Sequence, residues 1–335
     1  MANPVLVEIT RGAIVESVHR GSVAILDASG GVVLALGDVE TPVYSRSSLK
    51  PMQAIPLVES GAADAFGLGD EELALACASH SGEPMHVMRV AAWLERLGLG
   101  EGDLACGAHP SRYEPVAEAM IRRGEKPTRI FNNCSGKHTG FLSVARHWDI
   151  ATKGYEAVTH PVQQAVAKML RELSDAKALT VGIDGCAAPN FALSLTEFAR
   201  SAGRMAAPDS LPKERAKASR RLLAAMVAHP ELVSGTGRTC AMLMRATRGR
   251  AAVKAGAEGF YAAWVPEKGL GIAIKIDDGG GRAAETAIAA TLEALNLLDD
   301  ANLARSVLQP PILNTRGAVV GERRPAAALA KLTLV

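Results

Sequence analysis

Two residues near the start of the chain could form a catalytic pair. Ser47 and Lys50 stand three positions apart at the start of a predicted helix, and this spacing places both side chains on one helix face. A lysine with a lowered pKa can take the proton of a serine hydroxyl and turn it into a nucleophile. The motif alone also fits a serine N-cap beside a surface lysine.

A second group of small and polar residues follows about thirty positions later, with Ser79, His80 and Ser81 at a predicted helix-to-loop junction. All three side chains carry groups that could take part in catalysis. The alternative is a loop after a helix that Gly82 terminates.

A late lysine, Lys254, ends a predicted strand and is followed by Gly256 and Gly259. Glycines allow a ligand to approach the backbone closely, although a turn with an exposed lysine is the simpler alternative. An early Ser-x-x-Lys followed by a late Lys-x-Gly resembles the order found in serine β-lactamases and penicillin-binding proteins. Their middle Ser-Asp-Asn element is absent here.

Two cysteines stand in conspicuous local contexts. Cys134 lies in Asn-Asn-Cys-Ser-Gly-Lys-His, just before a predicted helix, where its pKa is expected to be lowered. Cys186 follows Asp184 after a short predicted strand. Together they could supply two soft ligands to zinc, with His138 nearby, or they could be two buried, inert thiols. Gly136 and Lys137 do not form a phosphate-binding loop, because its other residues are missing.

The elements that must position these residues are predicted as strands near both ends of the chain and helices in its middle. Strands are predicted at 5–9, 22–27 and 32–36, and again at 251–254, 259–265 and 269–276, where alternating apolar residues predict a sheet with one buried face. A helix is predicted from about Ser47 to Ser60, with a kink at Pro56. Helical patterns fill the middle, and an Ala-rich helix is predicted at 281–298. The sequence therefore predicts an α+β fold whose antiparallel sheet joins both ends of the chain, as one domain over residues 1–335 in which two lobes are allowed.

Composition excludes several classes of protein. The chain has 335 residues, 48% of them hydrophobic, and a net charge of only +2, so no nucleic-acid or membrane partner is expected. We find no export signal and no apolar run long enough to span a membrane. Five cysteines, an odd number, favour reduced thiols in a soluble, cytoplasmic protein.

Taken together, the motifs at 46–51, 77–80, 132–138 and 184–186 resemble the Rhizobium-type (class 3) L-asparaginases of the asparaginase II-like family. The resemblance runs from about Val5 to Leu298. It implies a serine β-lactamase-like fold, hydrolysis of L-asparagine to L-aspartate and ammonia, and a homodimer.

The resemblance also implies roles for individual residues. Two Ser–Lys tandems would share one pocket, a zinc ion would lie beside it, and three further residues would orient the substrate at its rim. These positions are Ser47–Lys50 and Ser79–Lys254 for the tandems, Cys134, Lys137 and Cys186 for zinc, and Arg46, His138 and Asp184 for the rim. Since an amine binds a metal only when it is neutral, His138 remains the rival of Lys137 as a ligand.

The expected reaction begins with attack of one serine on the side-chain amide carbon. Ser47 is favoured because its lysine is one helical turn away, whereas Ser79 could attack instead or relay protons. Two other interpretations remain open: another serine amidohydrolase of similar fold, or a non-enzymatic zinc or thiol sensor built on Cys134 and Cys186.

Overall fold

The computed structural model describes residues 2–332, which form two compact units assembled from separate stretches of the chain. Unit 1 contains the residues up to Ser48, 193–207, and the described residues from Met242 onward; unit 2 contains 49–192 and 208–241. The 3-10 helix η1 (Arg46–Leu49) and the helix α12 (Thr239–Ala246) each cross a boundary between these stretches. That the whole chain acts as a single domain stays a prediction.

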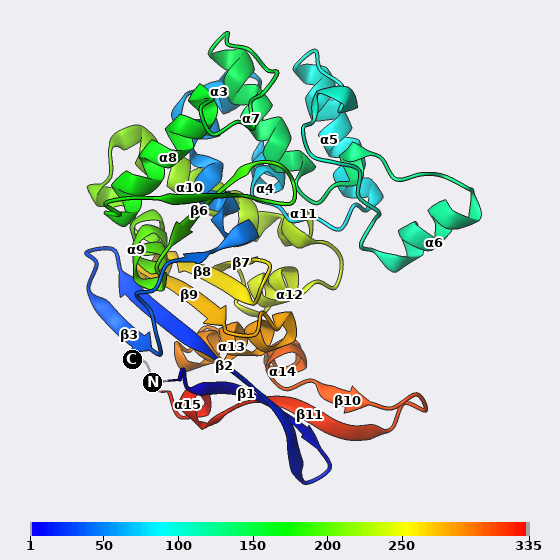
Figure 1. Cartoon of the computed structure of the whole chain (residues 1–335), viewed down its shortest axis with the longest axis vertical. Coiled ribbons are helices and arrows are strands. Elements are labelled where there is room, and N and C mark those ends of the chain that lie inside the picture. Colours follow the sequence, from blue (N-terminus) through cyan, green and yellow to red (C-terminus); the bar gives the residue numbers. More distant parts are fainter. Residues whose placement is uncertain (1, 333–335) are drawn as a thin grey trace. The chain divides into compact units, whose positions relative to one another are not determined.

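Unit 1 is built on an antiparallel sheet that combines strands from both ends of the chain (Figure 1), which confirms the predicted α+β class. The strand order is β10-β11-β1-β2-β9-β8-β7, and β3 pairs with β2. The strands are β1 (Val5–Arg11), β2 (Ile14–Asp27), β3 (Val32–Leu36), β7 (Ala252–Ala255), β8 (Phe260–Val265), β9 (Leu270–Ile276), β10 (Pro311–Leu313) and β11 (Val319–Pro325), with the short β4 (Val43–Tyr44) elsewhere in the unit.

The prediction that the late strands bury only one face is wrong. Helix α9 (Leu195–Ala206) packs against β2, β8 and β9, while α13 (Gly281–Ala294) contacts β8 and β9 (Figure 1). A Cβ added at Gly271 would lie 2.1 Å from the Ala199 carbonyl oxygen. The small residues of β9 that alternate with its isoleucines therefore allow a helix to pack closely on the second face.

The C-terminal part of unit 1 was not predicted from the sequence. Helices α14 (Ala301–Leu308) and α15 (Ala327–Ala330) and the hairpin of β10 and β11 follow α13. Strand β11 pairs with β1, where Val7 stands opposite Pro325. The sheet therefore extends well beyond the predicted resemblance, which ended near Leu298.

Unit 2 is mostly helical, as predicted for the middle of the chain. Helix α10 packs against α2 and α4, and the short strands β5 (Thr180–Ile183) and β6 (Pro189–Leu193) pair antiparallel. No helix in the described residues is long and apolar enough to cross a membrane. The helices are α1 (Lys50–Gln53), α2 (Ile55–Glu59), α3 (Ala62–Ala65), α4 (Asp70–Ala76), α5 (Pro84–Arg96), α6 (Glu114–Arg122), α7 (Ser135–His147), α8 (Pro161–Ser174), α10 (Lys213–Ala228) and α11 (Pro230–Ser234).

The single helix predicted from Ser47 to Ser60 is wrong. The segment consists of η1, α1 and α2, and a proline stands in the first turn of both α1 and α2. Proline has no N–H to donate and is tolerated at a helix start but not in its interior. Pro51 and Pro56 therefore break the segment into short helices, and Lys50 becomes the first residue of α1.

Candidate active site

Lys50 is a buried lysine whose amine contacts a serine. Only 1% of the residue is exposed. Its Nζ lies 2.5 Å from the carbonyl oxygen of Ala78, 3.2 Å from that of Asn133 and 3.0 Å from Oγ of Ser79. Loop backbone and one hydroxyl therefore surround the amine.

These three contacts have a chemical consequence. Carbonyl oxygens only accept hydrogen bonds, so two amine N–H groups point at Ala78 and Asn133. When Lys50 is neutral, its lone pair is left facing the Ser79 hydroxyl. Burial favours this form, because it lowers the pKa of Lys50 below its ordinary value, while the charge of Cys186 opposes the shift. Lys50 can therefore accept the Ser79 proton.

Ser79 owes its position to long-range backbone contacts. Helix α4 ends at Ala76, and the Ser79 N–H donates to the carbonyl oxygen of Val233 over 2.9 Å. Gly82 follows with a φ of +71°, a conformation that glycine adopts without strain. The half-buried Ser79 thus lies in a loop held between α4 and α11.

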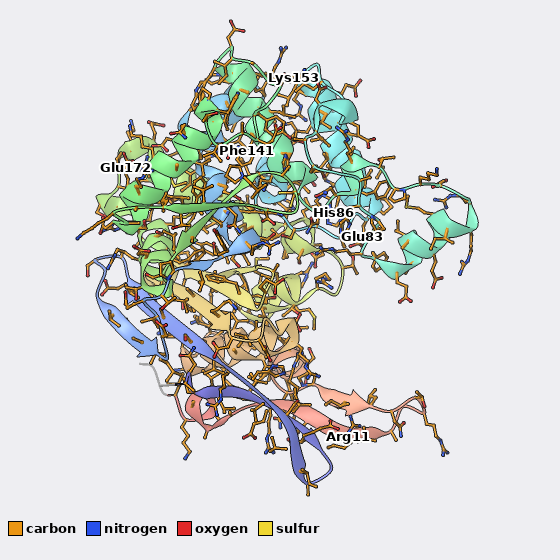
Figure 2. The ribbon with its side chains drawn as sticks, viewed as in Figure 1. Arg11, Glu83, His86, Phe141, Lys153 and Glu172 are labelled. Carbon is orange, nitrogen blue, oxygen red and sulfur yellow. The ribbon has the colours of Figure 1, made fainter. Side chains whose placement is uncertain are left out.

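His80 is structural in this arrangement. Its Nε2 lies 2.8 Å from Oγ of Ser135, its Nδ1 accepts from the Gly82 N–H, and its ring stacks on His86 at 5.0 Å. Figure 2 shows His86 beside Glu83 at the start of α5. Burial holds the pKa of His80 well below its ordinary value, so the ring stays neutral.

Three of the predicted zinc ligands lie together in unit 2. Cys134 precedes α7, Lys137 lies in its first turn, and Cys186 follows β5; all three are buried. The Lys137 Nζ lies 3.1 Å from the Cys186 sulfur, and Cys134 and Cys186 are hydrogen-bonded to each other. The fold therefore joins two motifs that are about fifty residues apart in sequence.

The expectation of a lowered pKa at Cys134 is wrong. Its hydrogen bond to Cys186 and its burial raise the pKa of Cys134. The pKa of Cys186 is lowered instead, first by the bond from Cys134 and also by the charge of Lys137. Although burial lowers it, the pKa of Lys137 is raised because Cys186 and Cys134 stabilise its charge. The directions of these shifts favour the thiolate at Cys186, beside the Lys137 amine.

His138 faces the same cluster from the neighbouring position. Its Nδ1 lies 2.6 Å from the Tyr155 hydroxyl, which accepts from the Ala105 N–H. Its Nε2 is buried without a hydrogen-bond partner in the part of the chain that the structure describes. Over that same part, no group of three or more His, Cys, Asp or Glu side chains is placed to hold a metal ion.

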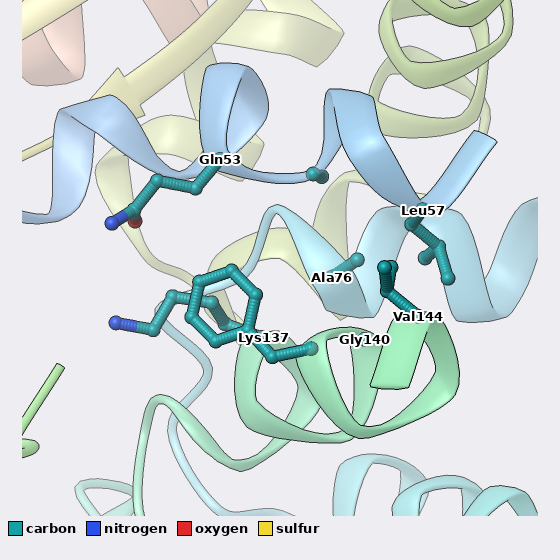
Figure 3. A pocket seen from close by; sticks show the side chains of 8 residues that line it. Gln53, Leu57, Ala76, Lys137, Gly140 and Val144 are labelled. Carbon is teal, nitrogen blue, oxygen red and sulfur yellow. The ribbon is translucent and has the colours of Figure 1, made fainter. Parts of the chain in front are cut away.

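A small cavity lies behind Lys137 (Figure 3). Its volume is about 10 Å³, which is close to the minimum for one water molecule and too small for an amino acid. The side-chain nitrogens of Lys137 and Gln53 point away from the apolar lining of Leu57 and Val144 (Figure 3). This cavity is a packing gap and not a substrate pocket.

The remaining tandem residues belong to unit 1. Ser47 lies in η1 next to Arg46, whose φ of +51° is uncommon for a non-glycine residue. Ser48 donates from Oγ to the Lys254 carbonyl oxygen over 2.8 Å, and Lys254 is fully buried in β7. A Cβ at Gly256 would lie 2.4 Å from the Ser45 carbonyl oxygen. Gly256 therefore makes room for the chain's own backbone, and Lys254 is not the exposed lysine of the alternative interpretation.

The two units thus contain different parts of the predicted site. Unit 2 brings together Lys50 with Ser79, and Cys134 with Lys137 and Cys186. Asp184 lies in the turn before Cys186, where its charge acts on Lys137. Sequence analysis missed the carbonyl oxygens of Ala78 and Asn133 and the hydroxyl of Tyr155, because backbone acceptors and a lone tyrosine leave no motif.

A lysine amine against a serine hydroxyl in an α+β fold is typical of serine amidohydrolases that use lysine as the base. The model of the L-asparaginase II family matches residues 7–325. The chain therefore belongs to this family of asparaginase-type amidohydrolases, as the sequence motifs predicted.

Similar solved structures include β-lactamases. A β-lactamase from Mycobacterium bovis is 17% identical over 83% of this chain and 95% of that one, with a TM-score of 0.44. A β-lactamase from Burkholderia vietnamiensis is 13% identical over 78% and 85%, with a TM-score of 0.35. A structure of Mglu is 16% identical over 84% of this chain and 62% of its own, with a TM-score of 0.40. At such low values these similarities carry no argument about function, and no curated protein matches the chain.

Proposed function

We propose that the chain is an L-asparaginase, which hydrolyses the side-chain amide of L-asparagine to L-aspartate and ammonia. Family membership supports the reaction class. The observation that carries the proposal is the buried Lys50 amine, 3.0 Å from the Ser79 hydroxyl.

In the proposed mechanism Ser79 Oγ attacks the amide carbon while Lys50 takes its proton. The tetrahedral adduct collapses when Lys50 returns that proton to the leaving nitrogen, and ammonia departs from a Ser79 ester. Water then attacks the ester carbonyl, Lys50 accepts the water proton and passes it to Ser79, and aspartate leaves. The contact with Lys50 is the reason for placing attack on Ser79, whereas sequence alone favoured Ser47.

Ser47 and Lys254 stay in the proposal as the second hydroxyl and the second amine, on the strength of the family resemblance. Arg46, His138 and Asp184 are retained as substrate-orienting residues on the same ground. The homodimer and the cytoplasmic location likewise remain predictions from the sequence.

The residues around Cys186 fit a zinc ion. Two buried sulfurs suit this metal, and the amine of Lys137 lies 3.1 Å from one of them. We assign Cys134, Cys186 and Lys137 as its ligands, with Lys137 neutral when the metal is bound. When bound, zinc supplies a fixed positive charge that holds the substrate and the shape of the site.

The zinc assignment predicts about one zinc per chain in the purified wild type and little in Cys186→Ala. Zinc content by mass spectrometry checks this, with Cys240→Ala, which removes a buried cysteine outside the cluster, as the matched control. Chelation of the wild type should raise KM for asparagine more than it lowers kcat. Full zinc content in Cys186→Ala would show that Cys186 is no ligand.

An ammonia assay with L-asparagine, L-glutamine and nitrocefin tests the function itself. We expect the wild type to release ammonia from asparagine and to leave nitrocefin intact. Nitrocefin turnover without ammonia release would favour another serine amidohydrolase. Zinc binding without hydrolysis of asparagine, glutamine or nitrocefin would favour a non-enzymatic zinc or thiol sensor.

A further inference from the structure

Two loops of unit 2 are attached to the segment that follows Ser79. In the first loop, the Arg112 N–H donates to the Ser81 carbonyl oxygen over 2.7 Å, and the Ser111 hydroxyl donates to the same oxygen over 2.9 Å. Ser81 is two residues after Ser79. The backbone at Arg112 is therefore held next to the proposed nucleophile's own loop.

Glu83 attaches the second loop to the same segment. Its carboxylate accepts from the Ser81 hydroxyl over 2.5 Å, and from the Thr236 N–H and hydroxyl over 2.9 and 2.7 Å. A Cβ at Gly235 would lie only 1.9 Å from the Ser81 Oγ, so the loops can meet only through glycine. The Arg238 N–H closes this turn by donating to the Gly235 carbonyl oxygen.

Each of these attached loops carries an arginine without a counter-ion. Neither Arg112 nor Arg238 forms an ion pair or a side-chain hydrogen bond within the described residues 2–332, and both are exposed. The Glu83 carboxylate, which joins the second loop to this segment, accepts hydrogen bonds from Ser81 and Thr236 and from neither arginine.

The charge of Arg238 also affects the pKa of Arg112. Partial loss of water, and then the positive charge of Arg238, lower the pKa of Arg112. Two positive charges carried on loops that are hydrogen-bonded to the same segment repel each other, and an anionic ligand would relieve that repulsion.

We propose that Arg112 and Arg238 together bind the α-carboxylate of the amino-acid substrate. A guanidinium presents a planar fork of donors that matches a carboxylate, and L-asparagine carries its α-carboxylate at the end opposite the reacting amide. This inference rests on the proposed function, since it names the part of asparagine that these residues recognise.

The test compares the wild type with Arg112→Gln, Arg238→Gln and the double variant on two amides. L-asparagine has the α-carboxylate, and β-alaninamide lacks it while keeping the amide and the amine. We expect each substitution to lower kcat/KM for asparagine about tenfold, mainly through KM, because a hydrogen bond to a charged group is lost. Turnover of β-alaninamide should stay the same, and lysine substitutions should restore part of the asparagine affinity.

Arg122→Gln is the matched control, because Arg122 is exposed in unit 2 and pairs with Glu118 on α6. It should leave both substrates unaffected. Calorimetric binding of L-aspartate gives a second readout, which should weaken in both arginine variants. Unchanged asparagine kinetics and aspartate affinity in the double variant, with an active wild type, would overturn this inference alone. An equal loss on both amides would also overturn it, whereas a wild type that releases no ammonia overturns the proposed function and this inference with it.

Discussion

Lys50→Met is expected to lower kcat for L-asparagine by about 10⁴-fold, the upper range for loss of a general base. Methionine has a similar shape but cannot accept the Ser79 proton. The amine is buried and two of its three contacts are to backbone carbonyls, so the substitution also removes a donor from these two acceptors and should lower the free energy of unfolding. Lys50→Arg is expected to be equally inactive, since arginine is never neutral in a protein. Ammonia release checks kcat, and thermal unfolding checks the fold.

Lys275→Met is the matched control for that experiment. Lys275 is a part-buried lysine of unit 1 whose pKa is also lowered by burial, and its amine contacts the Ile276 carbonyl oxygen at 2.5 Å. It should retain wild-type turnover. If Lys50→Met kept turnover within tenfold of the wild type, Lys50 would not be the base.

Ser79→Ala is expected to abolish turnover, with a loss in kcat of about 10⁴-fold or more, as for other catalytic nucleophiles. The expected cause is that no ester can form. Rapid acid quenching of the wild type with asparagine, followed by peptide mass mapping, should locate the aspartyl adduct on the peptide that contains Ser79. The variant should bind L-aspartate with nearly normal affinity, because only one oxygen is lost.

Two comparisons make the result decisive. Ser143→Ala removes a buried serine of unit 2 that bonds Trp93 and Thr139, so it should cost stability but not turnover. Ser47→Ala is expected from the family resemblance to lose activity as well, so activity alone does not separate the two serines. An adduct found on Ser47 would contradict the assignment of attack to Ser79.

The local elements of this protein could largely be predicted from its sequence. Alternating apolar residues predicted β8 and β9, and helical patterns predicted the helical middle of the chain and α13. The predictions failed where a proline or long-range packing overrode the local sequence pattern. Two prolines divided the predicted helix from Ser47 to Ser60, and packing of α9 buried the face of β9 that was expected to be exposed.

The candidate residues could also be found from the sequence, since the motifs that contain Ser79, Cys134 and Cys186 are local runs of reactive side chains. Their chemical states could not. The sequence predicted a lowered pKa for Cys134. The pKa of Cys186 is lowered instead, by the hydrogen bond between the two thiols and by the charge of Lys137. A pKa depends on the charges and the burial that surround a group, and these come from distant parts of the chain.

What the sequence by itself determined is the family, the α+β class and the identity of the reactive side chains, because these follow from short-range patterns. Which hydroxyl the Lys50 amine meets was decided by the tertiary structure alone. Spacing favoured Ser47, three residues away, whereas the folded chain places Ser79 and two backbone carbonyls around the amine. Long-range packing brings those groups together and places the Ser79 hydroxyl 3.0 Å from the amine.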